Sequence, residues 1–365
     1  MSRLLAKDPA RRCMQVSEWP ALDRALREKA LAAGDIIDGG EGFLAAYRGA
    51  TVTFLDQGYG RWLQWLFERG ELDPLEPPAG RITPERAVAF VKDLLRVNGT
   101  KTVIGRLAGI YYMARAQDPG HNLQFLRQHI ARIRARHVPV RNKYAKIVDI
   151  AALYQLGLNL MRTAPGHADM RRTRVQFRDG LLISVLAACP LRTGNALMLT
   201  IGKSFVEECG RWWIRFPGSA TKTGARFEMC LPEELSPYIA EYLTVYRPML
   251  LKCRGKRYRP AQQELWITNW GTALVTMYPI VTTHTRKAFG RPVNPHLFRD
   301  CASTAIAIAI PERVRIVMPV LGHRSLKTSE HAYNHAQSFE AFGRWHERLA
   351  DLRKGKLRSP RDAAL

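Results

Sequence analysis

Three histidines and a tyrosine lie within thirteen residues near the end of the chain, in the stretch LGHRSLKTSEHAYNHA (residues 321–336). His331 and His335 are four residues apart, so on a helix both rings would lie on one face, as the ligands of a zinc ion do. Position 332 is Ala, however, where a zinc-protease helix needs Glu, and the sequence shows no third ligand. We therefore expect no metal, and Tyr333 is the residue that needs an explanation.

Two arginines and a histidine earlier in the chain have the chemistry to hold a phosphate. In NPHLFRD (residues 294–300), Asn294 suits a helix N-cap and Pro295 the first helical position. His296 and Arg299 then share one face of the first turn, where backbone N–H groups favour an anion. Arg192 interrupts an apolar run, CPLRTGNALML (residues 189–199), and burying an unpaired arginine is costly. The structural alternatives are a charged helix end and an ordinary salt bridge.

Lys222 and the glycine before His323 add two further elements of this kind. Lys222 lies in SATKTGA, between the alternating segments RWWIRF and RFEMCLP, and this pattern predicts a β-hairpin over residues 211–232. A lysine on such a turn can deliver a proton, although most hairpin lysines only keep a strand edge in solvent. Gly322 permits a turn before His323, and Ser325 suits the N-cap of a helix that carries Tyr333.

Together these residues resemble the ordered signature of the tyrosine recombinase (phage integrase) family, which reads Arg, Lys, His-x-x-Arg, Gly-His and Tyr. The resemblance assigns the catalytic set to Arg192, Lys222, His296, Arg299, His323 and Tyr333. Each motif alone is weak, but the ordered set over about 140 residues is specific, and the likeness covers most of residues 45–345.

The family resemblance implies a site-specific DNA recombinase that integrates or excises a mobile element or phage. Tyr333 would attack a DNA phosphodiester, form a 3′-phosphotyrosine and release a 5′-hydroxyl, so that the bond energy is kept for rejoining. Arg192 and Arg299 would stabilise charge on the non-bridging oxygens. His296 would assist removal of the tyrosine proton, and Lys222 would protonate the leaving oxygen. No metal and no other cofactor is expected.

The chain departs from the family pattern at three places. Asn195 stands three residues after Arg192, where the family commonly has an acid, and Asp300 follows Arg299 where a histidine is frequent. The interval from His323, which would hydrogen-bond the phosphate, to Tyr333 is one residue longer than usual. No other tyrosine follows Tyr278, so the assignment of the nucleophile has no rival.

Two alternatives share the same fold. One is a type IB-like topoisomerase, which nicks and reseals DNA as a monomer, and the other is a catalytically inactive DNA-binding protein. The presence of all six residue types argues against an inactive relic. The segment 338–355 carries four apolar residues on one face, which favours docking on a neighbouring subunit over packing on its own domain: Phe339, Phe342, Trp345 and Leu349. As in the family, we expect a homotetramer on DNA with exchange of C-terminal helices, an assembly that accessory proteins can join.

The charge distribution indicates a polyanionic partner. The 365 residues include 56 Lys and Arg and 32 Asp and Glu, which gives a net charge of +24. Residues 1–100 carry 14 of each sign, so the whole excess lies in residues 101–365. Such a concentrated excess favours contact with double-stranded DNA over a merely solvated surface. We assign Lys101, Arg106, Arg141 and Lys143 to this contact.

Hydrophobic periodicity predicts a mainly α fold with a small β-sheet. We expect a helical N-terminal extension over residues 1–41, with Ser17 as its helix cap and Gly34 as its end. A helical core-binding domain over residues 42–138 follows, in which Thr83 caps a helix that begins at Pro84. A linker (residues 139–146), an α+β catalytic domain of tyrosine-recombinase type (147–353) and a basic tail (354–365) complete the chain.

Neither a membrane nor a secretory route is indicated by the sequence. The longest apolar stretches, residues 181–191 and 302–311, are too short to cross a bilayer, and the first residues lack a signal-peptide core. The six cysteines are scattered without a C-x-x-C pair, which is typical of reduced thiols. We therefore expect a cytoplasmic protein.

Overall fold

The computed structural model describes residues 9–34, 40–137, 144–221, 224–253 and 263–309. In these ranges the chain is mainly helical with one three-stranded antiparallel sheet, which confirms the predicted fold class at that level. The chain divides into two compact units between Val140 and Arg141, a point inside the segment expected as a linker. Each unit has its own hydrophobic core.

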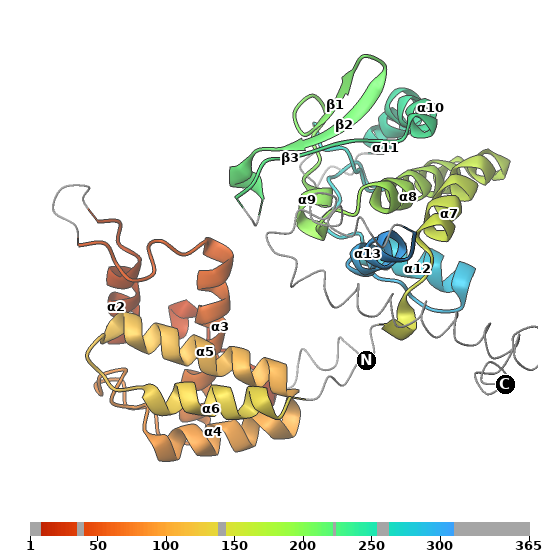
Figure 1. Cartoon of the computed structure of the whole chain (residues 1–365). Helices are drawn as coiled ribbons and strands as arrows, with labels where there is room; N and C mark the ends of the chain where they lie inside the picture. The colour runs from red at the N-terminus through yellow and green to blue at the C-terminus, as the bar shows by residue number, and fades with distance from the viewer. Residues whose placement is uncertain (1–8, 35–39, 138–143, 222–223, 254–262, 310–365) are drawn as a thin grey trace, which may run out of the picture. The chain divides into compact units, whose positions relative to one another are not determined.

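The described part of the N-terminal unit is a helical bundle. Its helices are α2 (Ala21–Leu31), α3 (Gly49–Glu68), α4 (Pro84–Val97), α5 (Thr100–Gln117) and α6 (Gln124–Ala135). Helices α5 and α6 run side by side (Figure 1), and α3 packs along α5. The α3–α5 crossing is close because Gly58 faces Gly109: a Cβ on Gly58 would lie 2.7 Å from the Gly109 Cα.

Residues before α3, which we expected as an extension, share the core of this bundle. Trp19 and Ala30 are buried in the same cluster as Trp62 of α3. Thr83 caps α4 as predicted, with its hydroxyl accepting from the Arg86 N–H at 3.3 Å. The expected cap at Ser17 is wrong. Pro20 disfavours the helical conformation in Trp19, which is extended with ψ 154°, so α2 begins only at Ala21, and it ends at Leu31 rather than near Gly34.

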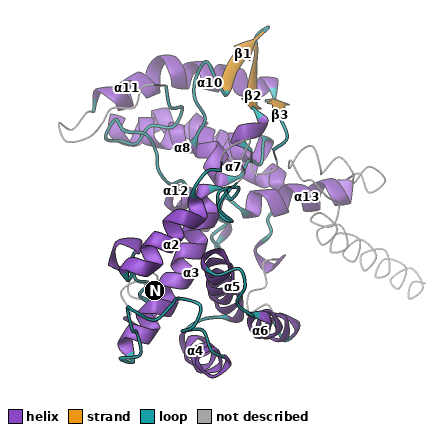
Figure 2. Ribbon diagram, turned by 90° about the vertical axis from the view of Figure 1, so that its left-hand side faces the viewer, coloured by secondary structure: helices purple, strands orange, loops and turns teal. Residues whose placement is uncertain are grey.

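The C-terminal unit contains a helical layer and a small sheet. Its first helices are α7 (Ile150–Thr163), α8 (Met170–Ala188) and the short α9 (Thr193–Leu197). After the sheet, α10 (Ser236–Glu241), a π-helical turn (Tyr242–Tyr246) and α11 (Arg247–Lys252) follow one another directly, and α12 (Tyr278–Phe289) and α13 (Leu297–Ala309) come last. Helix α8 is buried along most of its length, and Figures 1 and 2 both show it between the sheet and α12.

The sheet has the order β1-β2-β3, from β1 (Phe205–Glu208), β2 (Arg211–Phe216) and β3 (Phe227–Cys230). The β2–β3 hairpin confirms the prediction for residues 211–232, with Trp213 opposite Cys230 and Phe216 opposite Phe227. Strand β1 was not predicted, because four residues with two glutamates give little alternation to detect. Ile214 and other alternate side chains of β2 are buried against the core, which fixes the register.

Candidate functional site

Arg192 lies directly after α8, at the N-cap position of α9. Pro190 disfavours the helical conformation in the residue before it, and α8 accordingly ends at Ala188 with Cys189 already non-helical. Arg192 itself is extended, with φ −65° and ψ 140°, and its carbonyl accepts from the Ala196 N–H at 2.9 Å. Its side chain is half-buried. The apolar residues around it therefore position the guanidinium at the edge of the core rather than inside it.

Arg299 reaches the same place from the first turn of α13. Its Nη1 donates to the carbonyl oxygen of Pro190 at 2.7 Å, across 109 residues of sequence. Pro190 is two residues before Arg192, so this hydrogen bond holds the two arginine-bearing segments together. The structure thus brings together two of the residues that we predicted to act on one phosphate.

The electrostatics of Arg299 show that the two guanidinium groups interact. Burial and, to a smaller extent, the positive charge of Arg192 together lower the pKa of Arg299 to about 10, against the opposing effect of the Asp300 carboxylate. Arg299 therefore stays charged at neutral pH. Two like charges that are held within electrostatic range of each other make a favourable position for an anion.

His296 lies in the turn that leads into α13. The Asn294 side-chain oxygen accepts from the backbone N–H groups of His296 at 3.0 Å and Leu297 at 3.2 Å, so Asn294 closes the turn that leads into the helix rather than occupying the expected N-cap position. Helix α13 begins at Leu297, two residues after the proline that we expected as its first residue. The His296 side chain is exposed, and it shares this helix start with Arg299.

The connection from α12 to this turn is fixed by backbone contacts. Gly290 ends α12 in the left-handed conformation, with φ 68°, which favours glycine. Val293 follows in the core, and its N–H donates to the Thr285 hydroxyl at 2.9 Å. Arg291 donates to the carbonyl oxygens of Ala145 at 2.8 Å and of Ile147 at 3.0 Å. The turn that carries His296 is therefore tied to α12 and to the start of the unit.

A largely buried polar network joins α8 to α12. Asp179 accepts from the Arg178 Nε at 2.9 Å through one oxygen and is bonded to His284 Nε2 at 3.0 Å through the other. Arg178 also donates to the Ile267 carbonyl at 2.8 Å. Sequence analysis did not single out these residues, although the pair Arg-Asp inside the apolar run QFRDGLLISV is a detectable signal, since buried charges need partners. Their contacts hold α8, α12 and the segment at Ile267 together.

Several of the predicted site residues lie outside the described residues. These are Lys222, His323 and Tyr333 of the catalytic set, and Arg141 and Lys143 of the residues assigned to DNA. Of the remaining DNA assignments, Lys101 is exposed in the first turn of α5 and Arg106 is half-buried one turn further on. Asn195, which replaces the family's usual acid, is half-buried in α9.

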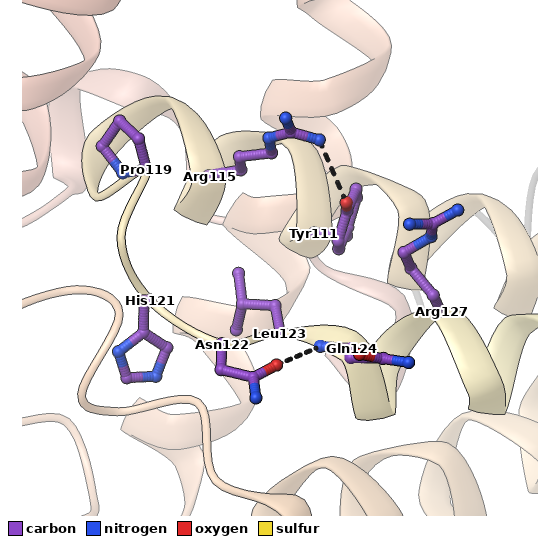
Figure 3. Close-up of a pocket in the computed structure, with 8 residues that line it drawn as sticks. All are labelled: Tyr111, Arg115, Pro119, His121, Asn122, Leu123, Gln124 and Arg127. Carbon is purple, nitrogen blue, oxygen red and sulfur yellow. Dashed lines mark hydrogen bonds between the residues drawn. The ribbon is translucent and has the colours of Figure 1, made fainter.

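A separate polar pocket lies in the N-terminal unit, between the end of α5 and the start of α6. It has a volume of about 210 Å³ and is open to solvent, and Figure 3 shows the residues that line it. Arg115 Nη1 donates to the Tyr111 hydroxyl at 3.3 Å. In the view of Figure 3 this pair and Arg127 lie at one end of the pocket, and His121 and Asn122 lie at the other. No prediction was made for this pocket.

Three further observations concern metals, membranes and cysteines. Within the ranges that the structure describes, no three His, Cys, Asp or Glu side chains come together as metal ligands would, and His331 and His335 lie outside those ranges. Among the described helices, none combines the length and hydrophobicity that a bilayer crossing requires. All six cysteines are described, and all are free thiols, as predicted.

No protein-family model matches the chain, and a search of curated proteins finds no match. Function is therefore inferred from the chain's own residues and their geometry.

Proposed function

We propose that the chain is a site-specific DNA recombinase that cuts and rejoins duplex DNA through a 3′-phosphotyrosine intermediate. The observation that supports this most strongly is the hydrogen bond from Arg299 to the Pro190 carbonyl, with the electrostatic contact between Arg299 and Arg192. It links the segment that carries Arg192 to the helix start that carries Arg299, three residues after the exposed His296. Two neighbouring guanidinium groups suit the two non-bridging oxygens of a phosphodiester.

In the proposed reaction the Tyr333 oxygen attacks the phosphorus, and the bond from phosphorus to the 5′-oxygen breaks. His296 takes up the tyrosine proton, and Lys222 gives a proton to the leaving 5′-oxygen. The phosphotyrosine bond replaces the phosphodiester bond, so a 5′-hydroxyl from another strand restores a phosphodiester by the reverse step. No bond energy is lost to water, and the scheme uses no cofactor.

Arg192 and Arg299 act on the charge that builds up during this exchange. In the transition state, negative charge grows on the non-bridging oxygens, and preorganised cations stabilise it most where water is partly excluded. The partial burial that lowers the pKa of Arg299 is such an environment. The Asp179 network supports this role indirectly, because it joins α8, which precedes Arg192, to α12, which precedes His296 and Arg299.

The proposed partner is double-stranded DNA, and the proposed assembly is a homotetramer that exchanges C-terminal helices. The net charge of +24 supports a polyanionic partner. The helix that would be exchanged falls in residues 310–365, which lie outside the described residues. A cytoplasmic location is part of the same proposal.

Single-turnover cleavage of a pool of nicked, randomised duplexes tests this function. We expect Arg192→Ala and Arg299→Ala to lower the cleavage rate by about 10²- to 10³-fold, because each removes one stabilising cation. Salt-dependent binding to the same pool should change little. Arg211→Ala is the matched control, since Arg211 is exposed on β2, and it should cleave at the wild-type rate. Wild-type cleavage by Arg192→Ala would contradict the proposal.

A further inference from the structure

Four exposed aromatic side chains form one face of the N-terminal unit. We call Phe43, Tyr47, Phe54 and Tyr112 the aromatic face; their exposed fractions are 37%, 37%, 48% and 36%. The ring centroids of Phe43 and Tyr47 are 6.0 Å apart, and those of Tyr47 and Tyr112 are 6.4 Å apart. Phe54 lies against Gly105, where a Cβ would meet its ring at 2.9 Å. Gly105 and Tyr112 are seven residues apart in α5, so Phe54 and Tyr112 lie on the same side of that helix.

The rings of this face are only partly covered, with between 36% and 48% of each side chain exposed. Exposed apolar side chains are usually scattered singly, and a contiguous group of them marks an interaction site. None of the four rings belongs to the buried core of the bundle. They are therefore available to a ligand.

Positive charge in this unit is concentrated in α5, the helix that carries Tyr112, and in the neighbouring α6. Helices α5 and α6 contain no Asp or Glu, and each carries three basic side chains, whereas α2, α3 and α4 each contain acids. The basic residues of α5 and α6 are Lys101, Arg106, Arg115, Arg127, Arg132 and Arg134. Asp118, in the loop between the two helices, lies 3.9 Å from His121. The charge around the face is therefore complementary to a polyanion. It is less complementary to a protein surface on which acidic and basic side chains are mixed.

Arg115 connects the aromatic face to the pocket of Figure 3. Its guanidinium lies 5.5 Å from the centroid of the Phe43 ring, and its Nη1 bonds the Tyr111 hydroxyl at the pocket. Tyr111 in turn packs edge-on against Tyr112, with centroids 5.2 Å apart. In Figure 3, Arg127 lies on the same side as this pair. Stacking rings and a cationic pocket therefore adjoin one another, as an aromatic base and its phosphate do.

We propose that the aromatic face and the adjoining pocket bind single-stranded nucleic acid. Bases stack on the exposed rings, and Arg115 and Arg127 contact the phosphates. A duplex does not satisfy this surface, because its base faces are already stacked on one another, whereas an unpaired strand offers both bases and phosphates. The proposal is independent of the cleavage chemistry proposed for the C-terminal unit.

The test is equilibrium binding of the full chain to a fluorescein-labelled thymidine oligonucleotide of about twelve nucleotides, within the range of known single-strand sites. Fluorescence anisotropy is measured, with the matched RNA strand and the matched duplex as separate arms. We expect Tyr112→Ala to weaken single-strand binding about fivefold or more through lost stacking. Tyr112→Phe should retain it, because stacking needs the ring and not the hydroxyl. The strand that binds more tightly, DNA or RNA, identifies which of the two the face recognises.

Two further variants separate stacking from charge and from folding. Arg115→Gln should reduce the slope of log affinity against log salt by about 0.7, the value for one phosphate of a single strand. Phe67→Ala is the matched control, since Phe67 is 62% exposed in the last turn of α3 and lies outside the aromatic face. It should leave binding and melting temperature unchanged.

Three outcomes would overturn the proposal. The first is wild-type oligonucleotide binding by both Tyr112→Ala and Arg115→Gln. The second is an equal loss of duplex and single-strand binding in Tyr112→Ala, which would make the face a duplex contact. The third is that Tyr112→Ala alters only the self-association of the protein, measured by sedimentation, which would make the face a contact between protein copies. Because no cleavage is measured, these results do not depend on whether Tyr333 is a nucleophile.

Discussion

The guanidinium of Arg299 is charged at neutral pH although both its burial and the nearby charge of Arg192 oppose that charge. The pKa of about 10 lies below the ordinary value for arginine, so the folded state holds this proton less tightly than the unfolded state. The resulting cost to stability is fully present below about pH 10, declines as the pH rises above the folded pKa and is gone only above the higher pKa of the unfolded state. An anion bound between the two arginines would offset that cost.

A small phosphate-like anion should therefore stabilise the protein. At about ten times its dissociation constant, sulfate should raise the melting temperature of the C-terminal unit by about 3–5 °C, measured by scanning calorimetry. Arg192→Ala should lose most of this increase, because one of the two cations is gone. General salt effects change the melting temperature of the wild type and of Arg192→Ala alike. The difference between the two proteins in the sulfate-induced increase therefore measures anion binding at Arg192. An equal increase in both would contradict an anion site at Arg192.

The same site has a predicted pH dependence. Sulfate should bind with constant affinity while Arg299 stays protonated and should weaken as the pH approaches the Arg299 pKa of about 10. Titration calorimetry between neutral pH and about pH 10 measures this change. If Arg299→Gln shows the same fall in affinity as the wild type, another group is responsible.

Asp23 is the residue on which the buried ion pair of the N-terminal unit depends. Its carboxylate accepts from Arg81 Nη1 at 2.9 Å and from the Tyr59 hydroxyl at 2.6 Å, and all three side chains are fully buried. Asp23→Ala should reduce the free energy of unfolding by about 3–5 kcal/mol, since it leaves the Arg81 charge without its buried counter-ion. Tyr59→Phe removes one hydrogen bond and should cost only about 1–2 kcal/mol. Urea denaturation gives both values, and an Asp23→Ala loss no larger than that of Tyr59→Phe would contradict this account.

Some of these residues could be predicted from their neighbours in the sequence and others could not, and the difference has a physical reason. Asn294, Arg299 and Arg192 carry local signals, namely a cap, a helix start and a charge in an apolar run. The pair Asp23–Arg81 joins residues 58 positions apart, and Asp179–His284 joins residues 105 positions apart. Such partners are chosen by tertiary packing, so neither residue's neighbours reveal them. The aromatic face was missed because aromatic residues in a helical domain are usually core residues.

At the scale of elements, both units rely on a crossing of two helices through glycine pairs. Gly58 faces Gly109 where α3 crosses α5, and Gly157 faces Gly180 where α7 crosses α8. A Cβ on Gly157 would lie 2.2 Å from the Ser184 hydroxyl and 2.6 Å from the Gly180 carbonyl. The helices can approach this closely only because these positions lack side chains. The α7–α8 crossing fixes the helix that leads to Arg192.

Gly109→Ala should destabilise the N-terminal unit despite the better helix propensity of alanine. Its Cβ would lie 2.6 Å from the Gly58 Cα, and forcing the helices apart should cost about 1–3 kcal/mol. Gly49→Ala is the matched control, because Gly49 is also helical and has no atom within 4 Å of an added Cβ. Thermal unfolding of both variants checks the prediction. A Gly109→Ala protein as stable as Gly49→Ala would show that the crossing can relax.

Helices and strands could be predicted from the sequence where capping residues and hydrophobic periodicity agree. Thr83 with Pro84 marks the start of α4, and the alternating β2 and β3 mark the hairpin. Helix α8 begins at Met170, well before the apolar stretch of residues 181–191, because Asp169 caps it by accepting from the Arg171 N–H at 2.8 Å. Its first residues are polar and basic, so hydrophobic periodicity alone could not extend the helix to this point.

At the scale of the whole molecule, the division of charge and the division of structure do not coincide. The basic excess begins at residue 101, inside the N-terminal unit, whereas the units divide at Val140. Helices α5 and α6 account for this difference, since they carry basic residues without acids. The two surfaces that we propose for nucleic acid therefore belong to different units, one with paired arginines and one with exposed rings. Composition predicted a polyanionic partner but could not assign its contacts to two units.

Each unit has its own core, so we expect two unfolding transitions in scanning calorimetry of the full chain. Asp23→Ala should lower the temperature of one transition, and Asp179→Ala should lower that of the other, because each removes a counter-ion from a different core. A single transition that both variants shift equally would indicate that the units unfold as one.

The central claim is that Tyr333 forms a covalent bond with DNA under the influence of Arg192 and Arg299. The most direct measurement is denaturing electrophoresis of the protein after incubation with a labelled pool of nicked, randomised duplexes, followed by mass spectrometry of the labelled peptide. The account predicts a labelled adduct on Tyr333 that resists denaturation and is absent from Tyr333→Phe. An adduct that persists in Tyr333→Phe, or no adduct with the wild type, would contradict it.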